Sequence, residues 1–145
     1  MVQKIIIDAD PGIGDALAIG LALDSPHFDV VGVTATAGVV SGTQAKKNLV
    51  AVIEQVDPPR HPRLGDASFE YPPEKPAAGG AWISSRDLHG ANGLGEMEGR
   101  VLNLHHAHSA HKIMIELVRS FPNEITIVTL GPLTNLAIAC DRDPE

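Results

Sequence analysis

The chain has 145 residues, of which 43% are hydrophobic and 20% charged, a composition typical of a globular protein rather than a disordered one. We take residues 1–145 as a single domain, long enough to bury roughly two-thirds of its unfolded surface. The net charge of −7 argues against nucleic acid as a partner. No apolar run reaches the roughly 20 residues of a membrane span, and a single cysteine, Cys140, rules out an internal disulfide. We therefore expect a cytoplasmic protein with no membrane partner.

Strand-like and helix-like segments alternate along the first part of the chain. Residues 4–9 form a continuous isoleucine-rich run, which predicts a strand buried on both faces. Residues 15–23 follow as a helix that is apolar nearly all round, and residues 28–37 are a second β-branched run. A helix is predicted next over residues 41–56, with Thr43 as its cap.

The alternation resumes after a long irregular segment. A short strand is predicted near residues 63–64. Residues 66–101 contain much Gly, Pro and charge and little periodicity, so we interpret them as a long loop. Beyond them we predict a helix over residues 103–121, a strand over 124–130 and a helix over 133–140.

This order predicts an α/β fold, with a doubly wound, mostly parallel sheet and helices on both faces. In such sheets ligands bind beyond the carboxyl ends of the strands. Polar or glycine-containing turns follow three of the predicted strands, namely Asp8 and Asp10, Gly38-Val39, and Gly131-Pro132. We expect the functional site at this edge.

The turn DADPGIGD, residues 8–15, places three aspartates close together, where like charges repel unless a cation or a bound proton neutralises them. A dinucleotide phosphate site is disfavoured, because the carboxylates would repel phosphate and Leu17 replaces the third small residue of that motif. An aspartyl phosphotransferase is a weak alternative, since Pro11-Gly12 stand where Gly-Thr is expected. Oxygen ligands that converge in this way suit Ca²⁺ or Mg²⁺. In the purely structural alternative, Asp15 caps the helix and Asp8 bonds to backbone amides.

These residues resemble a known family. DADPGIGDALA, residues 8–18, is similar to the DTDPGxDDxxA signature of the inosine–uridine preferring nucleoside hydrolases. The similarity continues through VVGVTATAG, LHGANGLG at residues 88–95, and EITIVTLGPLTNLAIA at residues 124–139. The resemblance implies a doubly wound α/β fold, a bound Ca²⁺ ion, and a small-molecule nucleoside as substrate, cleaved at its N-glycosidic bond into base and ribose.

The resemblance also implies roles for individual residues. Asp10 would be the general base and would contact the metal, Asp15 would be a bidentate Ca²⁺ ligand, and Leu130 would offer its backbone carbonyl to the ion. Asp8 would orient the site from behind these ligands. Carboxylates placed in this way would stabilise the oxocarbenium-like ribosyl cation while a metal-held water attacks.

Two substitutions depart from the family pattern within the expected pocket. Gly14 replaces an aspartate and Val39 replaces an asparagine, both of which hold sugar hydroxyls in the family. Each lost contact should weaken ribose binding by about 1.5–3 kcal/mol. Family members are about twice as long, so we expect this chain to be the N-terminal portion of the domain, either as a fragment or as a naturally truncated member. The second function hypothesis is therefore a truncated, catalytically impaired or inactive domain that keeps the fold, binds a cation weakly and self-associates.

Several other polar residues have both functional and structural interpretations. His89 and Asn92 are candidates for substrate contact, although a loop histidine is often solvated or bonded to backbone, and Asn92 with its glycines should shape the loop. The histidines of LHHAHSAH are spaced three apart, which favours a solvated helix surface over a zinc site; they are His105, His108 and His111. We expect Thr134 and Asn135 to cap the last helix and Cys140 to lie in the core.

Overall fold

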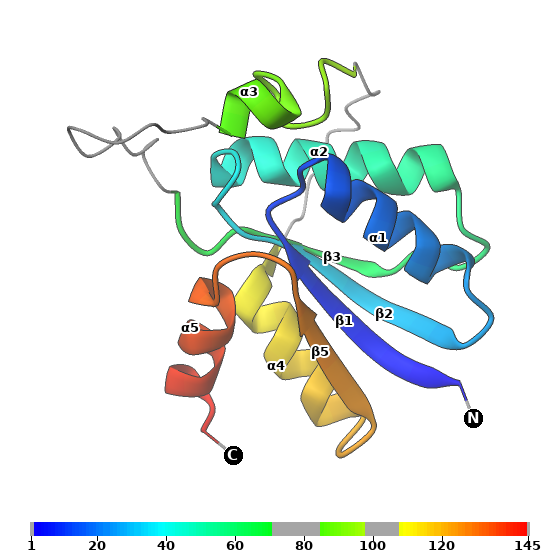
Figure 1. Ribbon diagram of the computed structural model, residues 1–145. Coiled ribbons are helices and arrows are strands. Elements are labelled where there is room, and N and C mark those ends of the chain that lie inside the picture. Colours follow the sequence, from blue (N-terminus) through cyan, green and yellow to red (C-terminus); the bar gives the residue numbers. More distant parts are fainter. Residues whose placement is uncertain (1, 71–84, 98–107, 145) are drawn as a thin grey trace.

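A five-stranded parallel sheet organises the computed structural model, which describes residues 2–70, 85–97 and 108–144 (Figure 1). The strand order is β4-β3-β2-β1-β5, and every neighbouring pair is parallel. The strands are β1 (Gln3–Ala9), β2 (Phe28–Ala35), β3 (Arg63–Asp66), β4 (His108–Ser109) and β5 (Ile125–Thr129). The helices are α1 (Ile13–Asp24), α2 (Gly42–Val56), α3 (Ser85–His89), α4 (Ala110–Ser120) and α5 (Thr134–Arg142). The predicted α/β class with a parallel sheet is confirmed.

Helices cover both faces of the sheet, with α1 and α2 on one side and α4 and α5 on the other (Figure 1). Successive residues of β1 point to opposite faces, so Ile5 and Ile7 join the core with α1 and α2, whereas Ile6 joins the core with α4. Ile6 is 0% exposed, and burial of such a side chain contributes about 1.5–3 kcal/mol. Burial on both faces explains why β1 is a continuous apolar run in the sequence.

The predicted element boundaries hold to within a few residues at most ends. Helix α2 is capped by Ser41, whose side chain accepts a hydrogen bond from the Gln44 N–H at 3.3 Å, so the prediction of Thr43 as the cap is wrong. The backbone at His108 and Ser109 pairs with β3, and α4 begins only at Ala110. The helix predicted over residues 103–121 therefore starts too early, and its first residues, 103–107, lie outside the described residues.

Two predictions about burial are wrong. Cys140 is exposed, because α5 turns Asn135 and Ala139 toward the protein and Cys140 lies on another side of the helix. His111 is only 6% exposed, because it shares the inner face of α4 with Met114. His108 is exposed as predicted, and His105 lies outside the described residues. Within the described ranges, no helix combines the length and the apolar character that crossing a membrane would require.

Candidate functional site

The acidic turn lies at the carboxyl end of β1, an inner strand of the sheet. Strand β1 lies between β2 and β5, and Asp8 pairs in register with Thr34 of β2 and Thr129 of β5. The carboxyl ends of all three strands therefore meet around the aspartates. Asp8 is 0% exposed and Asp10 is 7% exposed, which is rare for carboxylates without strong partners.

Asp8 is held by side chains from two other elements. Its Oδ1 accepts hydrogen bonds from Thr34 Oγ1 at 2.6 Å and from Asn135 Nδ2 at 2.8 Å. Its Oδ2 is buried and has no hydrogen-bond partner among the described residues. Burial raises the pKa of Asp8 from 3.8 to about 6, although the two hydrogen bonds act in the opposite direction and the charge of Asp10 adds to the rise.

The Asp10 carboxylate is enclosed by the backbone of the turns that follow β2 and β5. The Val39 N–H donates to its Oδ2 at 2.7 Å. A Cβ atom added to Gly38 or to Gly131 would fall on the Asp10 carboxylate, so only glycine leaves room on these two sides. Burial raises the pKa of Asp10, while the Val39 hydrogen bond opposes that rise. The turns after β2 and β5 thus fix the position of this side chain.

Asp15 lies in the first turn of α1, and its carboxyl group is within hydrogen-bonding range of that of Asp10. Burial raises its pKa, and the charge of Asp10 raises it further. The backbone of Gly12, the residue that precedes the helix, acts in the opposite direction and lowers the pKa of Asp15. Asp15 thus lies in the first turn of α1, where the helix dipole favours a carboxylate, and it also faces a second acid.

The donor set fits a hard cation in part. Two carboxyl groups can share a hydrogen bond only if one holds a proton, and a divalent cation between them would remove both the repulsion and the need for that proton. Within the described residues, no group of three or more His, Cys, Asp or Glu side chains is arranged to bind a metal. Asp8 Oδ1 is occupied by Thr34 and Asn135, so Asp10 and Asp15 form the facing pair. Since Ca²⁺ takes about 6–8 oxygens, these two would supply only part of its coordination.

Leu130 follows β5 and lies beside the aspartates. Its N–H donates to the Asp8 carbonyl at 2.8 Å, which extends the parallel pairing of β5 with β1. The next residue, Gly131, is the one whose added Cβ would fall on Asp10. The peptide that joins Leu130 to Gly131 is therefore adjacent to Asp10.

His89 reaches the same turn from α3. Its Nδ1 accepts a hydrogen bond from the Ile13 N–H at 3.3 Å, and a Cβ at Gly12 would lie 3.0 Å from this nitrogen. Because Nδ1 accepts, the ring holds its proton on Nε2 in this arrangement. His89 thus caps the start of α1 in a place where Gly12 has no side chain to do so, in line with the backbone-bonded alternative.

Asn92 shapes its own loop. Its Oδ1 accepts from the Leu94 N–H at 2.9 Å and the Glu96 N–H at 3.1 Å, and its Nδ2 donates to the Met97 carbonyl at 3.1 Å. These bonds use the carbonyl oxygen and one of the two amide hydrogens. The expectation that Asn92 shapes the loop is met, and contact with substrate stays a prediction.

The two departures from the family pattern lie at the site. Val39 contributes only its backbone N–H, which donates to Asp10. Gly14 is exposed in the first turn of α1, and an added Cβ would have no atom of the described residues within 4 Å. The space at Gly14 could therefore hold a side chain as large as aspartate.

Two buried asparagines belong to the site and were not predicted to do so. Asn48 of α2 is 3% exposed and donates to the Pro11 carbonyl at 2.9 Å and the Asn92 carbonyl at 2.8 Å, so it joins the acidic turn to the loop after α3. Asn135 binds Asp8 and does not cap α5, so that prediction is wrong. The one signal in the sequence is an amide within an otherwise apolar helical stripe, next to Leu49 in the case of Asn48.

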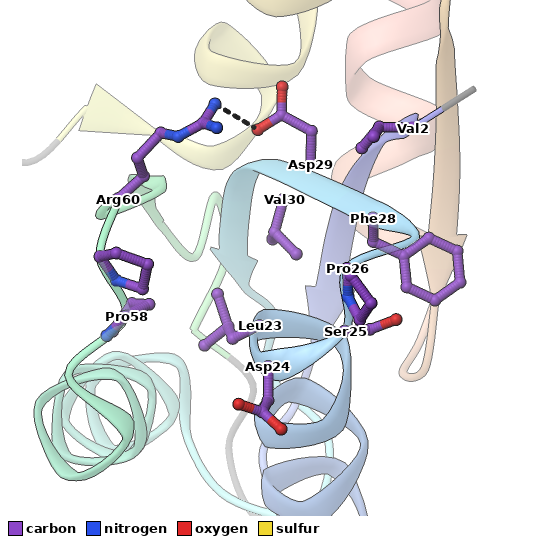
Figure 2. A pocket seen from close by; sticks show the side chains of 11 residues that line it. Val2, Leu23, Asp24, Ser25, Pro26, Phe28, Asp29, Val30, Pro58 and Arg60 are labelled. Atoms are coloured by element: carbon purple, nitrogen blue, oxygen red, sulfur yellow. Dashed lines mark ion pairs between the residues drawn. The ribbon is translucent and has the colours of Figure 1, made fainter.

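A separate pocket of about 370 Å³ lies at the opposite edge of the sheet (Figure 2). It is formed where α1 ends and β2 begins, and its lining includes Leu23, Phe28 and Pro58. An ion pair of 3.6 Å joins Arg60 to Asp29 at its rim. None of the three clustered aspartates lines this pocket, so the candidate site remains at the carboxyl edge.

Comparison with known proteins identifies relatives that are named nucleosidases or ribonucleoside hydrolases. Uridine nucleosidase 1 of Arabidopsis thaliana is 37% identical over 142 residues, which are 97% of this chain and 40% of that protein. The pyrimidine-specific ribonucleoside hydrolase RihA of Klebsiella pneumoniae is 31% identical and is covered to 45%. Among solved structures, a purine-preferring ribonucleoside hydrolase from Gardnerella vaginalis is similar with a TM-score of 0.81 at 28% identity, over 98% of this chain and 44% of that one.

The chain thus spans less than half the length of these relatives. A plant nucleoside hydrolase structure matches with a TM-score of 0.73 at 34% identity and is covered to 44%. The family model for the inosine-uridine preferring nucleoside hydrolases matches residues 5–145, which include the acidic turn and all described strands except the first two residues of β1. The chain belongs to the inosine-uridine preferring nucleoside hydrolase family.

Proposed function

We propose that this chain is the N-terminal portion of an enzyme that hydrolyses the N-glycosidic bond of ribonucleosides to a free base and ribose. The observation that carries the proposal is the cluster of the buried Asp8 and Asp10 with the half-buried Asp15 at the carboxyl end of β1, in a chain that belongs to a nucleoside hydrolase family. The names of the relatives specify uridine, pyrimidine ribonucleosides or purine ribonucleosides as substrates. We propose that the substrate of this chain belongs to the same group.

Asp10 is the proposed general base. The Val39 N–H and the two glycines hold its carboxylate in one place, which is what proton transfer to a positioned group requires. Its pKa is raised by burial, and a carboxylate with a raised pKa is a better acceptor for the proton of an attacking water. Asp15 and Asp8 add negative charge next to it, and this charge favours the positive ribosyl group that develops as the base departs.

We propose Ca²⁺ as the cofactor, held by the carboxylates of Asp10 and Asp15 and the backbone carbonyl of Leu130. When bound, the ion supplies positive charge that lowers the pKa of a nearby water and so favours a hydroxide nucleophile at neutral pH. The buried Asp8 Oδ2 without a partner among the described residues, together with the facing pair Asp10 and Asp15, supports a cation here.

A second candidate function is a catalytically impaired domain that retains the fold and cation binding. Gly14 and Val39 favour it, because neither side chain can hydrogen-bond a sugar hydroxyl, and a site that lacks such partners discriminates poorly for ribose. His89 and Asn92 remain the proposed substrate contacts of this chain. A cytoplasmic location and self-association as a homo-oligomer are further proposals.

Hydrolysis of p-nitrophenyl riboside, measured with Ca²⁺ and with EDTA, tests the proposal. The isosteric variant Asp10→Asn removes the base, and Asp24→Asn, an exposed aspartate at the far end of α1, is the matched control. We expect Ca²⁺-dependent release that falls about 10²–10⁴-fold in Asp10→Asn and is unchanged in Asp24→Asn. Release at the same rate in Asp10→Asn would refute the catalytic assignment, and no release from the unmodified chain would favour the second candidate.

A further inference from the structure

Asn135 joins the hydrogen bonds that hold Asp8. It lies in the first turn of α5 and is 1% exposed. Its Nδ2 donates to Asp8 Oδ1 at 2.8 Å and to the Ala35 carbonyl at 2.7 Å, and its Oδ1 accepts from the Ser68 N–H at 3.1 Å. A carboxylate and a carbonyl can only accept, and a backbone N–H can only donate, so these three partners fix the orientation of the amide.

We propose that Asn135 is a positioning residue that fixes the rotamer of Asp8, the buried carboxylate behind the facing pair Asp10 and Asp15. Asp8 Oδ1 is bound by Asn135 and Thr34, so rotation of the carboxylate would break two hydrogen bonds to a charged or polar group inside the protein. The fixed rotamer leaves only Oδ2 available to the cluster. This inference rests on the proposed function, because it assigns the role of Asn135 to the same site.

The position of Asn135 is itself reinforced from α4. Ser68, whose N–H binds Asn135, has its Oγ 2.8 Å from His111 Nδ1, and the His111 N–H donates back to that Oγ at 3.5 Å. His111 is 6% exposed, so this contact is inside the protein. The chain of contacts from Thr34 to His111 therefore ties the ends of β1, β2 and β3 to the starts of α4 and α5, and Asn135 is its centre.

The isosteric variant Asn135→Asp tests this role directly. It keeps an acceptor for the Ser68 N–H but turns an acceptor toward Asp8 and the Ala35 carbonyl, in place of two donors. We expect a lower melting temperature in EDTA. When Asp8→Asn is added, the new amide at position 8 can donate to the new carboxylate at position 135, so the hydrogen bond returns with donor and acceptor exchanged. The double variant should therefore regain part of the lost melting temperature.

Asn48→Asp is the matched control, because Asn48 is also nearly fully buried and its Nδ2 also donates two hydrogen bonds, but both go to backbone carbonyls and neither to Asp8. Asp8→Asn should not rescue this variant. An equal rescue of both asparagine variants, or of neither, would overturn the inference.

Calorimetric Ca²⁺ titration supplies the readout that a merely structural role would not change. We expect Asn135→Asp and the double variant to bind Ca²⁺ about 10–100-fold more weakly than the unmodified chain, because both change Asp8, which lies behind the proposed ligands, and outer partners of a metal site contribute that much to affinity. If Asn135→Asp does not fold, Asn135→Ser removes the donors without adding charge and should weaken Ca²⁺ binding in the same direction. Unchanged affinity in a folded Asn135 variant would refute the positioning role. If the unmodified chain binds no Ca²⁺, the proposed function fails, and the stability measurements alone decide whether Asn135 fixes Asp8.

Discussion

The metal-free chain should become less stable as the pH rises from 4 to 7, and Asp8 should be the main cause. A pKa raised from 3.8 to about 6 means that the folded state holds the Asp8 proton over a range in which the unfolded state has released it. At about 1.4 kcal/mol per pH unit, the ionised form is about 3 kcal/mol less favourable in the folded state. Below pH 3.8 both states are protonated and the penalty is absent; it grows between pH 3.8 and 6 and is complete above that.

The variant Asp8→Asn isolates this contribution. It keeps an oxygen that can accept from Thr34 and Asn135 but carries no charge, so its stability should lack the loss of about 3 kcal/mol that the unmodified chain shows. The new amide hydrogens at the buried Oδ2 position should lower stability by about 1–3 kcal/mol at every pH, which shifts the curve without changing its slope.

Thermal unfolding in EDTA between pH 4 and 7.5 is the assay. For a chain of this size, about 3 kcal/mol corresponds to a fall in melting temperature of about 6–12 °C. Asp24→Asn, which removes an exposed carboxylate, should keep the fall seen in the unmodified chain. A melting temperature that is flat over this range, or one that falls equally in Asp8→Asn, would refute the reasoning.

Three further predictions follow from the glycines and His89. Gly38→Ala should abolish Ca²⁺ binding, because its Cβ would fall on the Asp10 carboxylate. Gly14→Ala should instead raise the free energy of unfolding by about 0.5–1 kcal/mol, since it places a helix-favouring residue in open space. Thermal unfolding and Ca²⁺ titration of the two variants check this, and equal behaviour of both would contradict it. Gly14→Asp should lower the KM for a riboside if the missing carboxylate is what limits sugar binding, and an unchanged KM would exclude that explanation. His89→Ala should lower the free energy of unfolding by about 0.5–2 kcal/mol through the loss of the acceptor for the Ile13 N–H, and equal denaturation midpoints would show that this cap contributes nothing.

The sequence was sufficient to predict the parallel sheet and strands β1, β2, β3 and β5, but not β4, whose residues fall within a predicted helix. Most of β1 and the second half of β2 are buried, and β5 is mostly half-buried, so these three strands form β-branched runs that stand out without knowledge of any contact. The carboxyl ends of parallel strands share one edge, so the acidic turn and the glycine turns could be placed together before the structure was known.

The polar contacts behind the aspartates could not be predicted in the same way. Asn135 and Asn48 each lie in a helix, and their partners come from residues 37 to 127 positions away in the chain. Helical periodicity states which residues share a face but not which face meets the sheet, and this also explains why the burial of His111 and the exposure of Cys140 were predicted wrongly. Only the packing of α4 and α5 on the sheet decides these questions.

Direct titration of the metal-free chain with Ca²⁺ at pH 7, followed by calorimetry, tests most directly whether the aspartate cluster is a cation site. We predict one bound ion with a dissociation constant at or below about 1 mM, and no measurable binding to Asp15→Asn, while Asp24→Asn binds like the unmodified chain. Absence of binding at millimolar Ca²⁺, or equal binding to all three proteins, would contradict the account.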